Sequence, residues 1–146
     1  MPERSSPTGL EQMRAILDGR APAAPIQDLL SFDLVEAGES RAVFVCTPNE
    51  RMANPMGSVH GGIAMTLLDS AAGAAVHTTL AAGQGYATLE TKVNLVRAIT
   101  AETGEVRAEG AVVHRGKRVA TAEGRLVDAA GNLLAHATST CLILGG

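Results

Sequence analysis

Residues 54–80 have the sequence NPMGSVHGGIAMTLLDSAAGAAVHTTL, a polar loop followed by a long stretch with the composition of a helix. Between Gly61 and Ala82 the only formally charged residue is Asp69. A helix that is apolar on all sides is buried in a core or an interface. The stretch is too rich in Gly, Ala and Thr for a membrane span, and its central acid would be costly in lipid. We therefore predict a buried helix over residues 61–80.

The segments on either side of this helix have the alternating pattern of β-strands. Before it, a hairpin is predicted from residue 32 to residue 46, with a turn at Gly38-Glu39-Ser40. After it, four strands are predicted, over residues 86–97, 105–114, 118–128 and 133–144. Strict alternation in the first of these places Thr88 and Thr91 on opposite faces. This order predicts an α+β domain in which one curved antiparallel sheet wraps around the helix.

The first 30 residues are predicted to form an N-terminal extension with one short helix. Thr8 can cap this helix, Glu11 has the spacing of its capping-box partner, and Gly19 can end it. Residues 31–146 then form a single domain, because a chain of 146 residues leaves little room for a second one.

Composition and charge exclude several classes of partner. The net charge is −3 and the sequence pI is about 5.8, whereas nucleic-acid and anionic membrane partners favour basic surfaces. Only 2% of the residues are aromatic, so few side chains can stack on bases. Cys46 and Cys141 lie in apolar, strand-like runs and are interpreted as buried thiols, which suits the cytoplasm. The His and Cys residues have no metal-binding spacing, so no metal is expected.

Asp69 is the first candidate for chemistry. The residues one helical turn away from it are not basic: they are Met65, Thr66, Ala72 and Gly73. An unpaired carboxylate is costly to bury, and a residue kept at that cost is a candidate general base. The alternative is that Asp69 lies on an exposed stripe of the helix.

The start of the helix is the second candidate. Gly61 and Gly62 allow a ligand to approach the backbone, and the first N–H groups of a helix have no acceptor within it. Such donors can stabilise an oxyanion, although a Gly-Gly pair also occurs in an ordinary tight turn. Together with the polar residues Asn54 and His60, the acid and the donors suit acyl transfer to water.

Asn54, His60-Gly61-Gly62 and Asp69, with this spacing, resemble the motif of the hotdog-fold acyl-CoA thioesterases. The likeness is to the PaaI-type, phenylacetate-degradation-related branch of the 4-hydroxybenzoyl-CoA thioesterase superfamily, and it covers roughly residues 30–144. It implies a hotdog fold and a homodimer that pairs again into a homotetramer. It also implies that Asp69 of one chain faces the Asn54–Gly61 loop of the other.

The resemblance assigns a role to each residue of the motif. Asp69 would be the general base or a nucleophile, and the Gly61 N–H would polarise the thioester carbonyl. His60 and Asn54 would orient the loop and the substrate, and Thr88 would help to hold the water. Coenzyme A would be part of the substrate, so no separate cofactor is expected.

Substrate contacts are predicted for Gly62 and for the basic hairpin that contains Arg115, Lys117 and Arg118, which can bind the phosphates of coenzyme A. A solvated turn is the alternative interpretation of this hairpin.

The predicted function is hydrolysis of an acyl-CoA whose acyl group is aryl-acetyl, benzoyl-like or of medium length, because Ala64, Ala72 and Gly73 leave room along the helix. The alternative function is a non-catalytic module that binds or senses acyl-CoA. A hotdog dehydratase would need a different Asp/His pair, which we do not find.

Overall fold

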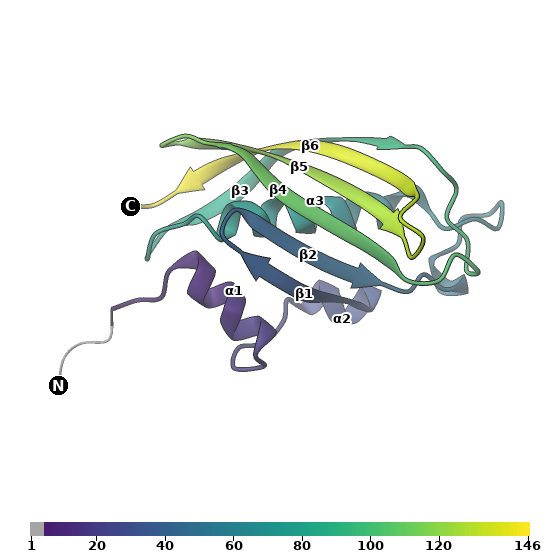
Figure 1. The fold of residues 1–146 in the computed structure, drawn as a ribbon, viewed down its shortest axis with the longest axis horizontal. Coiled ribbons are helices and arrows are strands. Elements are labelled where there is room, and N and C mark those ends of the chain that lie inside the picture. The colour runs from purple at the N-terminus through teal and green to yellow at the C-terminus, as the bar shows by residue number, and fades with distance from the viewer. Residues whose placement is uncertain (1–4) are drawn as a thin grey trace.

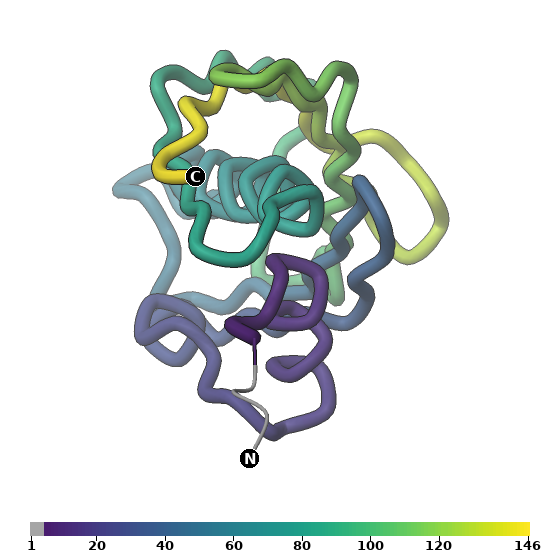
Figure 2. Tube along the Cα trace, turned by 90° about the vertical axis from the view of Figure 1, so that its left-hand side faces the viewer, coloured from purple at the N-terminus to yellow at the C-terminus, as the bar shows by residue number. Residues whose placement is uncertain are grey.

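The computed structural model describes residues 5–146, which form one antiparallel sheet, a long helix and a short N-terminal helical segment. The elements in chain order are α1 (Gly9–Leu17), α2 (Pro25–Leu30), β1 (Phe32–Gly38), β2 (Arg41–Cys46), a 3-10 turn η1 (Glu50–Met52), α3 (Gly61–His77), β3 (Gly85–Leu95), β4 (Val106–Arg115), β5 (Val119–Asp128) and β6 (Leu133–Leu144). The sheet has the order β1-β2-β4-β5-β6-β3 and curves around α3 (Figures 1 and 2). The predicted α+β fold is confirmed.

Small residues allow the sheet to approach α3 closely. Leu67, Leu68 and Ala71 of α3 are almost completely buried against it. Gly110 of β4 lies so close to the helix that a Cβ atom there would be 2.0 Å from the carbonyl oxygen of Ala71. The core is therefore built from Ala, Val and Leu rather than from aromatic rings, as the composition requires.

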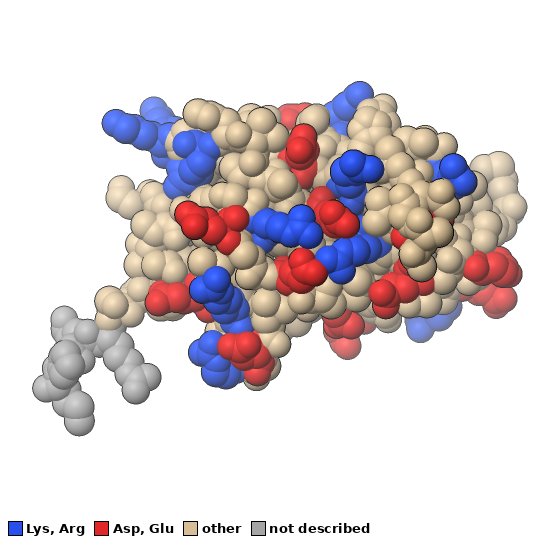
Figure 3. Space-filling model, viewed as in Figure 1, with Lys and Arg blue, Asp and Glu red and all other residues tan. Residues whose placement is uncertain are grey.

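The outer face of the sheet carries a network of exposed ion pairs. Arg107 contacts Glu36 at 2.5 Å and Glu109 at 3.3 Å, and Arg41 contacts Glu36 at 3.4 Å. Acidic and basic side chains alternate over this face (Figure 3). Exposed pairs of this kind add little stability, so the network marks the face that is turned to water.

The strict alternation predicted for residues 86–97 is wrong. The pairing of β3 with β6 shifts register between Thr88 and Glu90, because Leu89 is an extra, bulged residue. The bulge reverses the alternation beyond it, so Thr88 and Thr91 line the same hollow on the inner side of the sheet. A similar shift in β1, between Leu34 and Glu36, explains why the pattern there is irregular.

The N-terminal helix is capped as predicted and is docked on the end of α3. Thr8 and Glu11 form the reciprocal capping box, with bonds of 3.3 and 2.7 Å. The Gly9 N–H donates to the Leu80 carbonyl oxygen at 2.9 Å, and the Gln12 side chain hydrogen-bonds the His77 ring at 2.9 Å. The division at residue 30 stays a prediction. No helix within residues 5–146 is long and apolar enough to span a bilayer.

Candidate active site

His60 and the two glycines after it form the N-terminus of α3. The N–H of Gly62 donates to His60 Nδ1 at 2.9 Å, so His60 is the N-cap of the helix. An acceptor at Nδ1 leaves the proton of the neutral ring on Nε2. Gly62 was predicted to contact the substrate, but its N–H is already engaged by this cap.

The N–H of Gly61 has no hydrogen-bond acceptor among residues 5–146. Gly61 is the first residue of α3, where the helix dipole favours negative charge. It lines a hollow of about 230 Å³ together with Asn54, Ser58, His60 and Arg97. This is an available backbone donor in a cavity, which is the geometry that an oxyanion requires.

Asn54 shapes the loop beside this donor. Its side chain donates to Ser58 Oγ at 2.9 Å and accepts from the Met56 N–H at 2.9 Å. Gly57 between them has a φ of +90°, which favours glycine. Asn54 thus holds the loop that borders Gly61, which agrees with a role in positioning the loop.

Asp69 lies in the middle of α3 with its side chain toward β3. The hydroxyl of Thr91 donates to Asp69 Oδ1 at 3.2 Å and also contacts Ser139 Oγ at 3.2 Å. Asp69, Thr88 and Thr91 line a hollow of about 370 Å³. No basic residue within 5–146 forms an ion pair with Asp69. Thr91 was missed in the sequence because the bulge at Leu89 is not visible in the pattern.

Tyr86 lies close to the same carboxylate. Its burial, together with the negative charge of Asp69, raises the pKa of Tyr86 to about 12. The ring packs on the backbone of α3 at Gly73, where a Cβ atom would be 2.5 Å from the tyrosine hydroxyl oxygen. Tyr86 is therefore a neutral side chain that packs on α3 one helical turn from Asp69.

Gly61 and Asp69 cannot act on one substrate within a single chain. Asp69 follows Gly61 by eight residues of the same helix, which corresponds to about 12 Å along its axis. A base and an oxyanion donor must both lie about 3 Å from the reacting group. The available donor and the unpaired carboxylate therefore do not meet within one chain.

The predicted basic hairpin is at the other end of the molecule from Gly61. Lys and Arg side chains gather where β4 turns into β5 (Figure 3). Arg115 is engaged by the protein: its guanidinium donates to Thr79 Oγ1 at 3.0 Å, to Gln84 Oε1 at 3.2 Å and to the carbonyl oxygen of Gly116. Lys117 and Arg118 are exposed and remain available to a phosphate.

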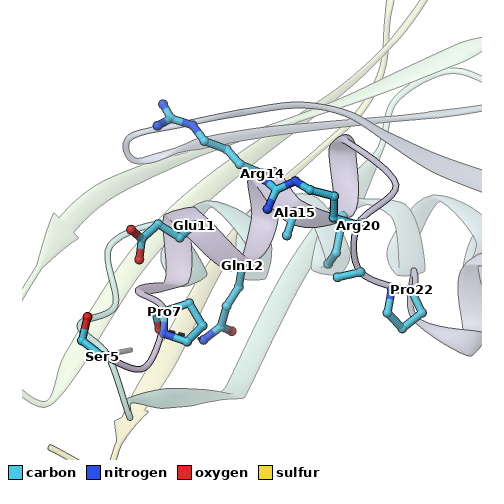
Figure 4. A pocket seen from close by; sticks show the side chains of 10 residues that line it. Ser5, Pro7, Glu11, Gln12, Arg14, Ala15, Arg20 and Pro22 are labelled. Atoms are coloured by element: carbon cyan, nitrogen blue, oxygen red, sulfur yellow. Dashed lines mark hydrogen bonds between the residues drawn. The ribbon is translucent and has the colours of Figure 1, made fainter. Parts of the chain in front are cut away.

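A larger hollow, of about 720 Å³, lies along α1. The charged side chains of Glu11, Arg14 and Arg20 extend from it in different directions and do not converge on one point (Figure 4). The residues that line it include none of the candidate catalytic residues. This hollow is therefore a surface groove without a catalytic arrangement.

Residues 56–135, more than half of the chain, match the model of the thioesterase superfamily. The chain belongs to the thioesterase superfamily. A Saccharolobus solfataricus protein, provisionally named an esterase, is 30% identical over 114 residues, which are 78% of this chain and 73% of that protein.

Two solved structures have the same fold. One is a phenylacetic acid degradation-related protein of Ralstonia eutropha, provisionally described as a thioesterase, with a TM-score of 0.81 and 26% identity over 89% of this chain and 98% of that one. The other is the E. coli PaaI protein of the phenylacetic acid degradation operon, with a TM-score of 0.81 and 21% identity over 92% of this chain and 95% of that one. The PaaI-type resemblance and the hotdog fold are confirmed, and membership of the superfamily supports thioester hydrolysis as the general activity.

Proposed function

We propose that this thioesterase-superfamily protein hydrolyses acyl-CoA thioesters at sites shared between two protomers. The observation that carries the proposal is the pairing of an available Gly61 N–H with an unpaired Asp69 carboxylate, about 12 Å apart on one helix. A second copy can supply the missing half of each site.

The edge strand β3 is the surface through which two copies would pair. It is hydrogen-bonded to β6 on one side only. Leu89 is 57% exposed, Leu95 is 53% exposed, and Met65 of α3 beside them is 45% exposed. An exposed apolar edge is a liability unless another strand covers it. A two-fold axis at β3 would set the α3 helices antiparallel and carry Asp69 of one chain toward Gly61 of the other. We also propose that two such dimers pair into a homotetramer, as the family resemblance implies.

In the proposed reaction the thioester carbonyl oxygen accepts a hydrogen bond from the Gly61 N–H of one protomer. Asp69 of the other protomer takes a proton from water, and the water oxygen attacks the carbonyl carbon. The oxyanion then collapses, the C–S bond breaks, and coenzyme A leaves as a thiolate that takes the proton from Asp69. Alternatively, the Asp69 carboxylate attacks the carbon itself and water hydrolyses the resulting anhydride. In both routes Thr91 orients the carboxylate, and Thr88, which lines the same hollow, would hold the water.

Lys117 and Arg118 would contact the phosphates of coenzyme A, whereas Arg115 would hold the hairpin in place. Arg97 borders the Gly61 hollow and adds a cation on that side of the site. The reaction needs no further cofactor, because coenzyme A arrives with the substrate.

The test is thiol release from a panel of acetyl-, hexanoyl-, palmitoyl-, benzoyl- and phenylacetyl-CoA. Wild-type protein is expected to turn over at least one of them, and Asp69→Asn is expected to lower kcat by orders of magnitude while the protein stays folded. An active Asp69→Asn variant would contradict the assignment of Asp69. Binding of acyl-CoA without turnover by the wild type would instead favour the non-catalytic module.

A further inference from the structure

The N-terminal segment of the chain encloses an apolar cavity against α3. The cavity has a volume of about 190 Å³ and is partly open. Its walls include Met13 and Ile16 of α1, Ile26 of α2, and Phe32 and Phe44 of the sheet. Figure 2 shows α1 lying beneath α3, so these residues close a space that the sheet and α3 leave open on that side.

Two polar side chains in the walls, Gln27 and His77, are already hydrogen-bonded by the protein, and most of the other lining residues are apolar. Gln27 accepts from the Ala24 N–H at 3.1 Å and donates to the Phe32 carbonyl oxygen at 3.5 Å. His77 is hydrogen-bonded to Gln12, and burial lowers the pKa of His77, which keeps it neutral near pH 7. An occupant of this cavity would therefore meet mainly apolar surface.

The cavity lies next to the carboxylate of the proposed site. Ser70, which directly follows Asp69, lines it from the α3 side, and Tyr86 lines it from β3, two residues before Thr88. The Tyr86 hydroxyl lies against Gly73, which is one helical turn beyond Asp69 on α3, so Tyr86 borders both the cavity and the surroundings of the carboxylate. Ala74, also in the wall, is five residues or about 7.5 Å further along α3 than Asp69.

We infer that this cavity holds the acyl tail of the substrate, and that α1 and α2 thereby select thioesters with a phenylacetyl- or hexanoyl-sized group. The inference rests on the proposed thioesterase function. A tail that starts at a carbonyl beside Asp69 passes Ser70 and Tyr86 and ends against Ala74, Met13 and Ile16. Apolar cavities of about 150 Å³ accept a benzene ring, so a phenyl group fits here and a palmitoyl chain does not.

Two substitutions of opposite sense test the inference by acyl-chain preference. Ala74→Leu fills the cavity, and it should lower the ratio of kcat/KM for phenylacetyl-CoA to that for acetyl-CoA by at least about tenfold. Met13→Ala enlarges the cavity, and it should raise the ratio for decanoyl-CoA over hexanoyl-CoA. Leu17→Ala is the matched control, because Leu17 is half-buried on the same helix but does not line the cavity. Parallel changes with all substrates, or unchanged ratios in both variants, would overturn the inference.

A binding measurement separates failure of the inference from failure of the proposed function. The methyl signals of Met13 and Ile16 are followed by NMR in Asp69→Asn protein during titration with phenylacetyl-CoA, and with coenzyme A alone. Both signals should shift with the thioester and not with coenzyme A. If the wild type hydrolyses nothing and these shifts still occur, the proposed function fails and the acyl cavity stands. Turnover by the wild type without these shifts would refute the inference that the cavity binds the acyl tail, and the proposed thioesterase function would stand.

Discussion

The substitution Gly61→Pro removes one N–H group from the proposed site with little cost to the fold. Gly61 is the first residue of α3. Proline is favoured at this position because the N–H of the first helical residue has no acceptor within the helix. The preceding residue, His60, has φ −57° and ψ 132°, which is the extended conformation that proline requires of its neighbour. The structure therefore predicts a folded variant whose melting temperature is close to that of the wild type.

The cost to catalysis should be much larger than the cost to stability. Loss of one oxyanion-hole donor lowers kcat by about 10² to 10³, or about 2.7–4 kcal/mol. A Cβ atom at Gly61 would also lie 2.7 Å from Cδ1 of Leu95, the end of a flexible, exposed side chain that can move. Gly61→Ala makes this same contact but keeps the N–H, so it is the matched control and should lose less than about tenfold.

The assay is steady-state hydrolysis of the best acyl-CoA of the panel, with circular dichroism melting on the same samples. A Gly61→Pro variant that is folded and keeps more than about a tenth of the wild-type kcat would refute the reasoning, since the donor would then not be used. Equal losses in Gly61→Pro and Gly61→Ala would assign the effect to the side chain instead of the N–H.

Three further predictions follow from single contacts. Tyr86 is the only tyrosine in a chain without tryptophan, so its ultraviolet titration should give a pKa of about 12, and Asp69→Asn should lower it. Because this pKa is raised, the stability that Tyr86 contributes to the folded protein is complete below pH 10 and is lost as the pH rises toward 12. A pKa near the ordinary value of 10 would contradict the buried position of Tyr86 beside Asp69. Thr91→Val removes the bond to Asp69 and should lower kcat about tenfold, and an unchanged kcat would show that the bond is not used. Gly110→Ala should lower the free energy of chemical unfolding by about 3 kcal/mol, because the added Cβ would clash with backbone atoms of Ala71. Gly38→Ala is the control, because a Cβ there has no atom within 4 Å, and equal effects of the two substitutions would contradict the close packing at Gly110.

Most of the fold follows from local pattern in the sequence. The capping box at Thr8, the apolar helix after Gly61 with Asp69 as its single charged residue, and the last three strands are all visible as runs with the correct period. The pairing of β3 with β6 is a non-local contact that no window of residues contains. The bulge at Leu89 is likewise set by pairing with the neighbouring strand, so the alternation in the sequence predicted the wrong face for Thr91 relative to Thr88.

The candidate site could be predicted as a set of residues but not as an arrangement. Asp69 stood out because no basic neighbour on its helix neutralises it, and the Gly61 donor followed from its place at a helix start. What each polar group bonds could not be predicted: Gly62 is engaged by His60, and Arg115 by the Thr79 hydroxyl. The Arg115 bond depends on a tertiary distance, which composition and spacing do not contain, whereas the His60 cap is a local bond that depends on the orientation of the ring.

The central claim is that each active site combines Asp69 of one protomer with Gly61 of the other, and mixing two inactive variants tests it most directly. Asp69→Asn and Gly61→Pro chains are co-refolded, and thiol release is compared with that of each variant alone. Half of the dimers would be mixed, and each would contain one intact site, so about a quarter of the wild-type activity should return. If the mixture stays as inactive as its parents while mixed dimers are shown to form, both residues act within one chain and the shared site is wrong.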